Sequence, residues 1–274
     1  MLFLFFILSG CIEKEEKISF EYSNMIDNHT QNEIKHLLSQ SEVSNDKIEL
    51  FFKFVADFYK VPYEGIAENG FVSTPISDFT YDSFSTKITT KHWNELGFDD
   101  YDYDINCRVA AFTLIQDFIH LRSNYTKPIK IIDEIILDKH YLLDYKQEMK
   151  DKYALLFNDV SVATEANKGE ASNTIIQNWN DIGLYFNNDV PIKMISMYVQ
   201  NRESEFIQVA HAAILLETTD YLYLIEKYNP QEPYQVSKFR QINEIKTYLL
   251  QRLNQDKLNT SQNIIIMQNN ECIY

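Results

Sequence analysis

The sequence is poor in glycine, proline and cysteine, and no apolar run in it is long enough to span a membrane. Its 274 residues include only six Gly, six Pro and three Cys. So few Gly and Pro exclude collagen-like chains, Gly/Ser linkers and Pro-rich disordered proteins. Three Cys are too few for a disulfide scaffold. A membrane-spanning helix needs about 20 predominantly apolar residues, which no segment supplies.

Positive charge is also scarce. Lys and Arg number 25 against 40 Asp and Glu, which gives a net charge of −15. Nucleic-acid binding depends on neutralising phosphates with Lys and Arg, so we expect no nucleic-acid partner. The sequence contains no phosphate-binding loop, Rossmann glycine motif, GxSxG elbow or HExxH motif, and we predict neither a cofactor nor a metal ion. Aromatic residues reach 14%, enough for a sizeable core.

The first eleven residues, MLFLFFILSGC, are apolar or small up to Cys11. This pattern is typical of a secretory signal that ends in a bacterial lipobox, although no Lys or Arg precedes the apolar run. We therefore predict a signal peptide over residues 1–10, a lipidated Cys11 and a polar tether over residues 11–18. The protein would be anchored outside the cytoplasm on the cell membrane without a spanning helix. The alternative is a buried N-terminal strand.

The rest of the chain predicts one α+β domain over residues 19–274, with helices first and an antiparallel sheet second. Thr30 with Glu33 is expected to form the capping box of a first helix, and Asn45 or Asp46 to cap a second. Apolar spacing predicts further helices over 106–121, 140–157, 172–182 and 240–253. Gly183 suits a helix C-cap. Alternation predicts strands over 192–199, 207–216, 221–228 and 264–267. Residues 20–26 are expected either to pair as a short strand or to pack as a clip. Residues 63–100 show no clean period, and we expect them to be irregular with short strands.

The helix over residues 106–121 is the clearest of these, and it places Cys107 in its first turn. Asn106 is a good N-cap. Free N–H groups and the helix dipole at this end favour a thiolate and lower the pKa of a cysteine. Arg108 adds a nearby positive charge, although we expect it to pair with Asp104 on the surface.

The hairpin formed by the predicted strands 207–216 and 221–228 supplies a candidate partner for the Cys107 thiol. If its turn pairs Glu217 with Asp220, then His211 lies directly opposite Glu226 on the same face of the sheet. A shift of one residue would separate them. The same face carries the apolar residues Ala213, Leu215, Leu222 and Leu224.

Together, Cys107, His211 and Glu226 form the pattern of a thiol nucleophile, a general base and an orienting acid. In chain order and placement this resembles papain-like cysteine hydrolases, including NlpC-type, CHAP-type and transglutaminase-like domains. The resemblance implies a central helix packed on an antiparallel sheet, and hydrolysis or acyl transfer at amide bonds, such as those of cell-wall peptides. The N–H of Cys107 would be one oxyanion donor. The upstream oxyanion Gln of papain has no counterpart.

A second resemblance covers nearly the whole chain. Its segments are FEYSNMIDNHTQNEIKHLL, DINCRVAAF, HAAILLE, LIEKYNPQEPYQVSKF and IIIMQNNECI. They are similar to an uncharacterised family of Firmicutes lipoproteins, a domain of unknown function. That family usually has Gly before the His, where this chain has Ala210. The resemblance implies a lipoprotein setting but no activity.

Several alternatives remain open. Cys107 is also a good core residue, His211 and Glu226 also suit a structural ion pair, and a disulfide between Cys107 and Cys272 would remove the nucleophile. The protein would then be a non-catalytic binding or envelope-assembly lipoprotein.

A polar loop would either line a substrate groove or form a Pro-bounded turn; it contains Gln231, Glu232, Tyr234 and Gln235. The segment DDYDYDIN departs from calcium-loop spacing.

Overall fold

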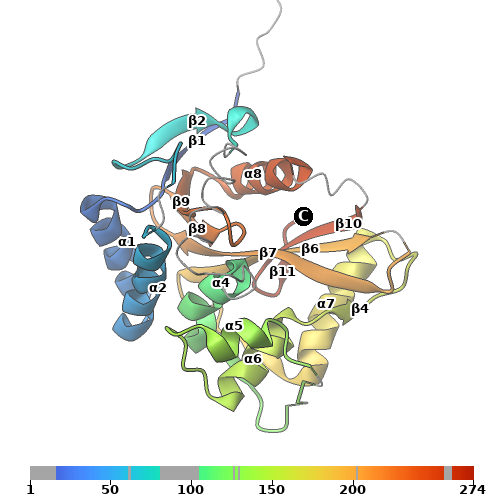
Figure 1. The fold of residues 1–274 in the computed structure, drawn as a ribbon. Coiled ribbons are helices and arrows are strands. Elements are labelled where there is room, and N and C mark those ends of the chain that lie inside the picture. Colours follow the sequence, from blue (N-terminus) through green and yellow to red (C-terminus); the bar gives the residue numbers. More distant parts are fainter. Residues whose placement is uncertain are drawn as a thin grey trace, which may run out of the picture.

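The computed structural model describes residues 17–60, 63–80, 105–125, 127–128, 130–201, 203–255 and 261–274. These residues form an α+β fold of seven helices and a nine-stranded antiparallel sheet (Figure 1). The helices are α1 (Asn28–Gln40), α2 (Asn45–Phe58), α4 (Cys107–Ile115), α5 (Glu134–Lys139), α6 (Gln147–Phe157), α7 (Lys168–Ile182) and α8 (Ile242–Gln255). None of these helices has the length and apolarity needed to cross a bilayer.

The sheet is built mainly from the C-terminal half. Its path is β11 (Glu271–Cys272), β10 (Ser261–Gln268), β6 (Ile192–Asn201), β7 (Phe206–Glu217), β8 (Leu222–Lys227), β9 (Tyr234–Phe239), β1 (Ser19–Ser23) and β2 (Val72–Pro75). Off this path, β4 (Val160–Ser161) pairs with β7, and β3 (Ile119–Leu121) pairs with β5 (Leu184–Phe186) in a separate ribbon.

Two short strands from the N-terminal part of the chain join the sheet, at the positions where residues 20–26 and residues 63–100 were expected to supply short strands, so the order of helices first and sheet second is not strict. There β1 pairs with β9 and β2 pairs with β1, so the first described strand extends the C-terminal sheet. The backbone groups of β9 would otherwise form an open sheet edge, and β1 supplies the hydrogen-bond partners that such an edge lacks. Strand β9 itself includes Tyr234 and Gln235, which a loop or turn was expected to contain.

Helices cover both faces of the sheet (Figure 1). One face packs against α2, α4, α6 and α7 around a large apolar core. The opposite face packs against α8 in a smaller core that includes Ala213, Leu215 and Leu224. The predicted apolar face of the hairpin is therefore confirmed, and α8 is the element that covers it.

Helix α4 is shorter than its apolar pattern predicts. It ends at Ile115, and a 3₁₀ turn over Gln116–Phe118 leads directly into β3. Every residue of α4 except Arg108 is buried. A helix surrounded by core shows no polar face, so the apolar pattern continues from helix into strand without marking the boundary.

Local capping explains several other differences, and Ser44, rather than Asn45 or Asp46, is the N-cap of α2. Asp27, rather than Thr30, is the N-cap of α1, and its carboxylate accepts a hydrogen bond from the N–H of Thr30. Asn167 and Glu170 form a capping box that starts α7 before the predicted residue 172. Gly183 ends α7 in a left-handed conformation with φ 83°, as predicted. The predicted helix over 140–157 is shortened to α6, because residues 140–146 contain a turn at residues 141–142 and are otherwise irregular.

Candidate functional site

The N-terminus of α4 is the starting point of the candidate site. Oδ1 of Asn106 accepts a hydrogen bond of 3.0 Å from the N–H of Val109, which confirms Asn106 as the N-cap. Cys107 is the first residue of the helix and is 6% exposed. The first turn leaves the N–H groups of Cys107 and Arg108 without intrahelical partners, so this end of the helix favours negative charge.

His211 and Glu226 are in contact, but their register differs from the predicted one. The hairpin pairs Glu217 with Leu222 rather than with Asp220, a shift of two residues. A shift of two preserves the face on which each side chain lies, because side chains alternate with a period of two. His211 therefore reaches Glu226 along a diagonal, and its Nε2 lies 2.7 Å from Glu226 Oε2.

A β-bulge at Ala210 sets the direction of the histidine. Met197 of β6 pairs with His211 and Tyr198 pairs with Val209, so Ala210 has no partner on β6. Before the bulge, Ile207 and Val209 pack in the large core, and after it the even-numbered residues of β7 do so. The extra residue places His211 on the α8 face of the sheet with Ala213 and Leu215,.

Cys107 and His211 shift each other's titration. Burial raises the pKa of the Cys107 thiol, but the nearby His211, the charge of Arg108 and the N–H of Ala212 outweigh it, and the net pKa is lowered. Burial lowers the pKa of His211, but the Cys107 sulfur and the Glu226 carboxylate outweigh it and raise the pKa to about 9. Both directions favour a thiolate–imidazolium pair.

The two contacts of His211 are unequal. Its Nε2 is engaged by Glu226, which leaves Nδ1 for the thiol. Nδ1 is buried and makes no hydrogen bond of standard length and angle within the described part of the chain. The contact with Cys107 is therefore looser than the one with Glu226, as in many unliganded nucleophile–base pairs. Cys107 and Cys272 are both free thiols, so the disulfide alternative is wrong.

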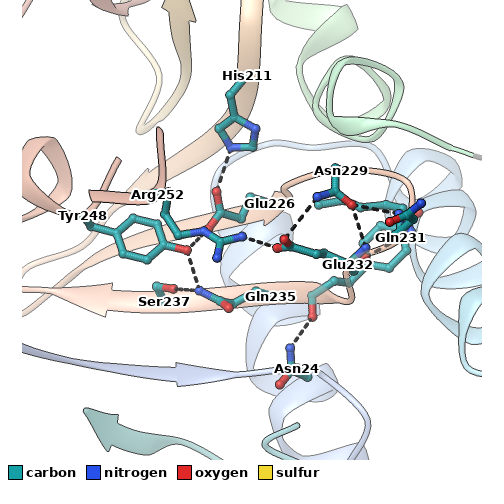
Figure 2. A network of polar contacts seen from close by, with 12 residues as sticks. Asn24, His211, Glu226, Asn229, Gln231, Glu232, Gln235, Ser237, Tyr248 and Arg252 are labelled. Atoms are coloured by element: carbon teal, nitrogen blue, oxygen red, sulfur yellow. Dashed lines mark hydrogen bonds and ion pairs between the residues drawn. The ribbon is translucent and has the colours of Figure 1, made fainter. Parts of the chain in front are cut away.

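Around Glu226, a buried polar network extends into α8 and β9 (Figure 2). Tyr248 Oη donates a hydrogen bond of 2.5 Å to Glu226 Oε1. Tyr228 packs on the imidazole, with ring centroids of Tyr228 and His211 4.7 Å apart. Arg252 forms an ion pair with Glu232. The predicted polar loop therefore divides: Glu232 serves this network, and Gln235 enters it from β9.

Asp104, the expected partner of Arg108, lies outside the described residues, and within them Arg108 pairs with Asp133. Its Nε and Nη2 each lie 2.7 Å from a carboxylate oxygen of Asp133. Tyr153 Oη donates a hydrogen bond of 2.5 Å to the same carboxylate. Burial raises the pKa of Asp133, but Arg108, Tyr153 and Asn106 outweigh it and lower the pKa. This bidentate pair fixes the first turn of α4 against the segment that precedes α5.

A pocket of about 440 Å³ opens beside the helix N-cap. Its lining residues are Asn106, Lys130, Ile131, Asp133, Glu134, Ile135, Ile136 and Pro230. They come from the start of α4, the segment around α5 and the loop between β8 and β9. Within the described residues, no group of three or more His, Cys, Asp or Glu side chains is arranged to hold a metal ion.

Asp133 and Tyr248 escaped the sequence analysis, and Gln235 was expected in a loop or turn rather than on a strand. Asp133 lies 25 residues from Arg108, and Tyr248 lies 22 residues from Glu226. No local spacing connects residues this far apart. The one available signal was the apolar face of the hairpin, which required a covering helix, and the predicted helix over 240–253 was the nearest candidate in sequence.

Comparison with known proteins identifies a family for this chain. A family model described as DUF4300, a domain of unknown function, matches residues 21–273. The chain belongs to the DUF4300 family. The match includes Cys107, His211, Glu226 and Tyr248, so the whole candidate site lies within the DUF4300 domain. No curated protein and no solved structure matches the chain.

Proposed function

We propose that this DUF4300 protein is a thiol hydrolase or acyl transferase acting on amide or peptide bonds. One observation carries the proposal: His211 contacts Glu226 and interacts with Cys107, and the pKa shifts of both Cys107 and His211 favour a thiolate–imidazolium pair. A single ion pair between strands would explain the contact between His211 and Glu226. It would not explain a thiol with a lowered pKa at a helix N-terminus beside them.

Each of the three residues has a defined step in this reaction. The thiolate of Cys107 attacks the amide carbonyl carbon, and the carbonyl oxygen becomes an oxyanion near the N–H of Cys107. His211 gives its proton to the leaving amine as the C–N bond breaks, which leaves a thioester. His211 then takes a proton from water, or from an acceptor amine, as that group attacks the thioester and releases Cys107. Glu226 holds the imidazole throughout.

We also propose that the α+β fold is papain-like. A cysteine at the start of a helix that packs against β7, followed in sequence by a histidine on β7 of an antiparallel sheet, supports a papain-like arrangement. We also propose that the protein is a lipoprotein, anchored through Cys11 on the outer side of the cell membrane. In that position cell-wall peptides are the substrates within reach.

The test is the pH dependence of Cys107 alkylation in the full-length protein. Iodoacetamide labelling is followed by mass spectrometry of peptides, so that exposed Cys272 serves as an internal reference thiol. We expect Cys107 to react well below the ordinary thiol pKa of about 8.5, and to lose this reactivity in His211→Ala. The ultraviolet absorbance of the thiolate reports the same ionisation without requiring reagent access.

A matched pair of variants then tests catalysis. Cys107→Ala is expected to abolish peptide or amide turnover while changing the free energy of unfolding by no more than about 1–2 kcal/mol. Cys272→Ser is the control and is expected to retain turnover. A Cys107 thiol that titrates like Cys272 and ignores His211→Ala would refute the proposal.

A specific observation supports a second candidate, a non-catalytic binding or envelope-assembly lipoprotein. Cys107 is only 6% exposed, and the pocket beside it is lined by Asn106 but not by Cys107. In this alternative, the pocket binds a partner and Cys107 is a core residue. Peptide binding that persists in Cys107→Ala, without turnover in the wild type, would favour the binding protein.

A further inference from the structure

Both carboxylate oxygens of Glu226 have a partner. Its Oε2 contacts His211 of β7 at 2.7 Å, and its Oε1 accepts a hydrogen bond of 2.5 Å from Tyr248 of α8 (Figure 2). The Glu226 and His211 side chains are each 1% exposed. Burying a carboxylate this deeply is costly unless hydrogen bonds replace the lost water. Tyr248 supplies such a bond on the side that His211 does not reach.

Gln235 fixes the direction of the tyrosine proton. Its Nε2 donates hydrogen bonds to Tyr248 Oη at 3.0 Å and to Ser237 Oγ at 2.7 Å. An amide nitrogen has no lone pair to accept a hydrogen bond. The Tyr248 oxygen therefore accepts from Gln235, and its single proton points to Glu226. The donors thus run in one direction, from β9 through α8 to the carboxylate.

Other charges around Glu226 come from α8 and from the loop after β8. Arg252 forms an ion pair with Glu232. Its Cζ lies 4.1 Å from the centre of the Tyr228 ring. Burial lowers the pKa of Arg252, but the neighbouring Tyr248, Glu232 and Glu226 have the larger effect, so the net pKa of Arg252 is raised. Arg252 therefore remains a fixed cation near the carboxylate, and α8 contributes both a hydrogen bond and a positive charge.

We propose that Tyr248 is a positioning residue of the thiol site, which holds the Glu226 carboxylate aimed at His211, with Gln235 setting the direction of the tyrosine proton. This inference rests on the proposed function. It assigns α8, which packs on the sheet face opposite α4, a part in the ionisation of Cys107. Tyr248 donates its hydrogen bond to Glu226, so it acts on the thiol through Glu226.

The variant Tyr248→Phe tests this with the loss of one oxygen atom. Without this donor, the Glu226 carboxylate is held less firmly against His211, so the imidazolium loses part of its support and gives up its proton at lower pH. The thiolate then loses its cationic partner. We expect the pH midpoint of the Cys107 thiolate, followed by alkylation and by ultraviolet absorbance in the full-length protein, to rise by about one unit, or about tenfold in the ionisation constant.

The control is Tyr125→Phe, which removes a tyrosine hydroxyl that donates to another carboxylate, Asp151, at 2.9 Å. We expect it to leave the Cys107 midpoint unchanged. If Tyr248→Phe does not fold, Gln235→Met serves as the test. This variant leaves Tyr248 in place as a weaker donor to Glu226, so we expect a smaller rise of the Cys107 midpoint. Imidazole nitrogen NMR of His211 follows the movement of its proton directly.

The outcomes separate this inference from the proposed function. If the Cys107 midpoint is low in the wild type and stays equally low in folded Tyr248→Phe, the role of Tyr248 is overturned and the thiol hydrolase remains intact. Where Tyr248→Phe does not fold, an unchanged low midpoint in Gln235→Met has the same meaning. An ordinary thiol midpoint in the wild type would overturn both.

Discussion

His211 is the residue on which the proposed chemistry depends, because its two nitrogens serve different partners. Glu226 engages Nε2, and the thiol of Cys107 interacts from the other side. In the neutral ring, a proton on Nε2 directed at the carboxylate leaves Nδ1 as the base. The neighbouring carboxylate therefore selects the tautomer that the reaction needs.

The pH profile of the reaction follows from these shifts. The imidazolium must be present to protonate the leaving amine, and its pKa of about 9 keeps it charged below that value. The rate should therefore fall as pH rises through about 9, and should also fall on the acidic side where the thiolate, with its lowered pKa, takes up a proton. The measurement is kcat/KM on a peptide substrate as a function of pH.

The variant Glu226→Gln sharpens this prediction. It keeps a side chain of the same shape but removes the negative charge that favours the imidazolium. The basic limb should move to lower pH by about one unit or more. A basic limb that stays near pH 9 in Glu226→Gln would show that Glu226 does not set the ionisation of His211.

At the scale of single elements, the bulge in β7 is the feature that creates the site. Ile207 and Val209 before the bulge, and Ala212 and Ile214 after it, all face the large core. A regular strand cannot present odd residues and then even residues to one face. Ala210 takes up the difference, and the residue after it, His211, faces α8 instead.

Deletion of Ala210 should therefore destabilise the protein. Either Ile207 and Val209 or the residues after the bulge must leave the core, and exposing two such side chains costs about 3 kcal/mol or more. Chemical denaturation measures the loss in the free energy of unfolding. Ala210→Gly is the matched control, because it shortens the side chain and keeps the residue count. Wild-type stability and thiol reactivity in the deletion variant would contradict this account of the bulge.

At the scale of the whole molecule, the sheet separates two helical layers and the site draws on both. Cys107 comes from α4 on one face, while Tyr248 comes from α8 on the other. His211 and Glu226 lie between them, near the end of the ladder between β7 and β8, whose last pair is Ile214 with Ile225. The site therefore exists only when both layers are packed on the sheet.

The net charge of −15 leads to a prediction about the intact protein. A strongly acidic chain is not attracted to anionic lipid, so membrane attachment should depend on the proposed lipid at Cys11. In bacterial cells, Cys11→Ser should move the protein from the membrane fraction to the soluble fraction, while Cys272→Ser should not. Membrane association that survives Cys11→Ser would show that the lipid is not the anchor.

Within this molecule, the sequence by itself determined what depends on neighbours along the chain. Asn106 caps a helix and presents Cys107 in its first turn because the capping interaction spans only three residues,. His211 and Glu226 share a face because side-chain alternation is local, and an error of two residues in the register preserves it.

Only the tertiary structure decided what joins distant segments. Strand β9 and its Gln235 are defined by pairing with β8 and β1 rather than by a clear alternation of their own. The pairing of β3 with β5 sets the end of α4. The placement of Asp133 gives Arg108 its partner. The docking of α8 gives Glu226 its second contact, with Tyr248. Such contacts depend on how the core packs, and residue spacing along the chain carries no record of that packing.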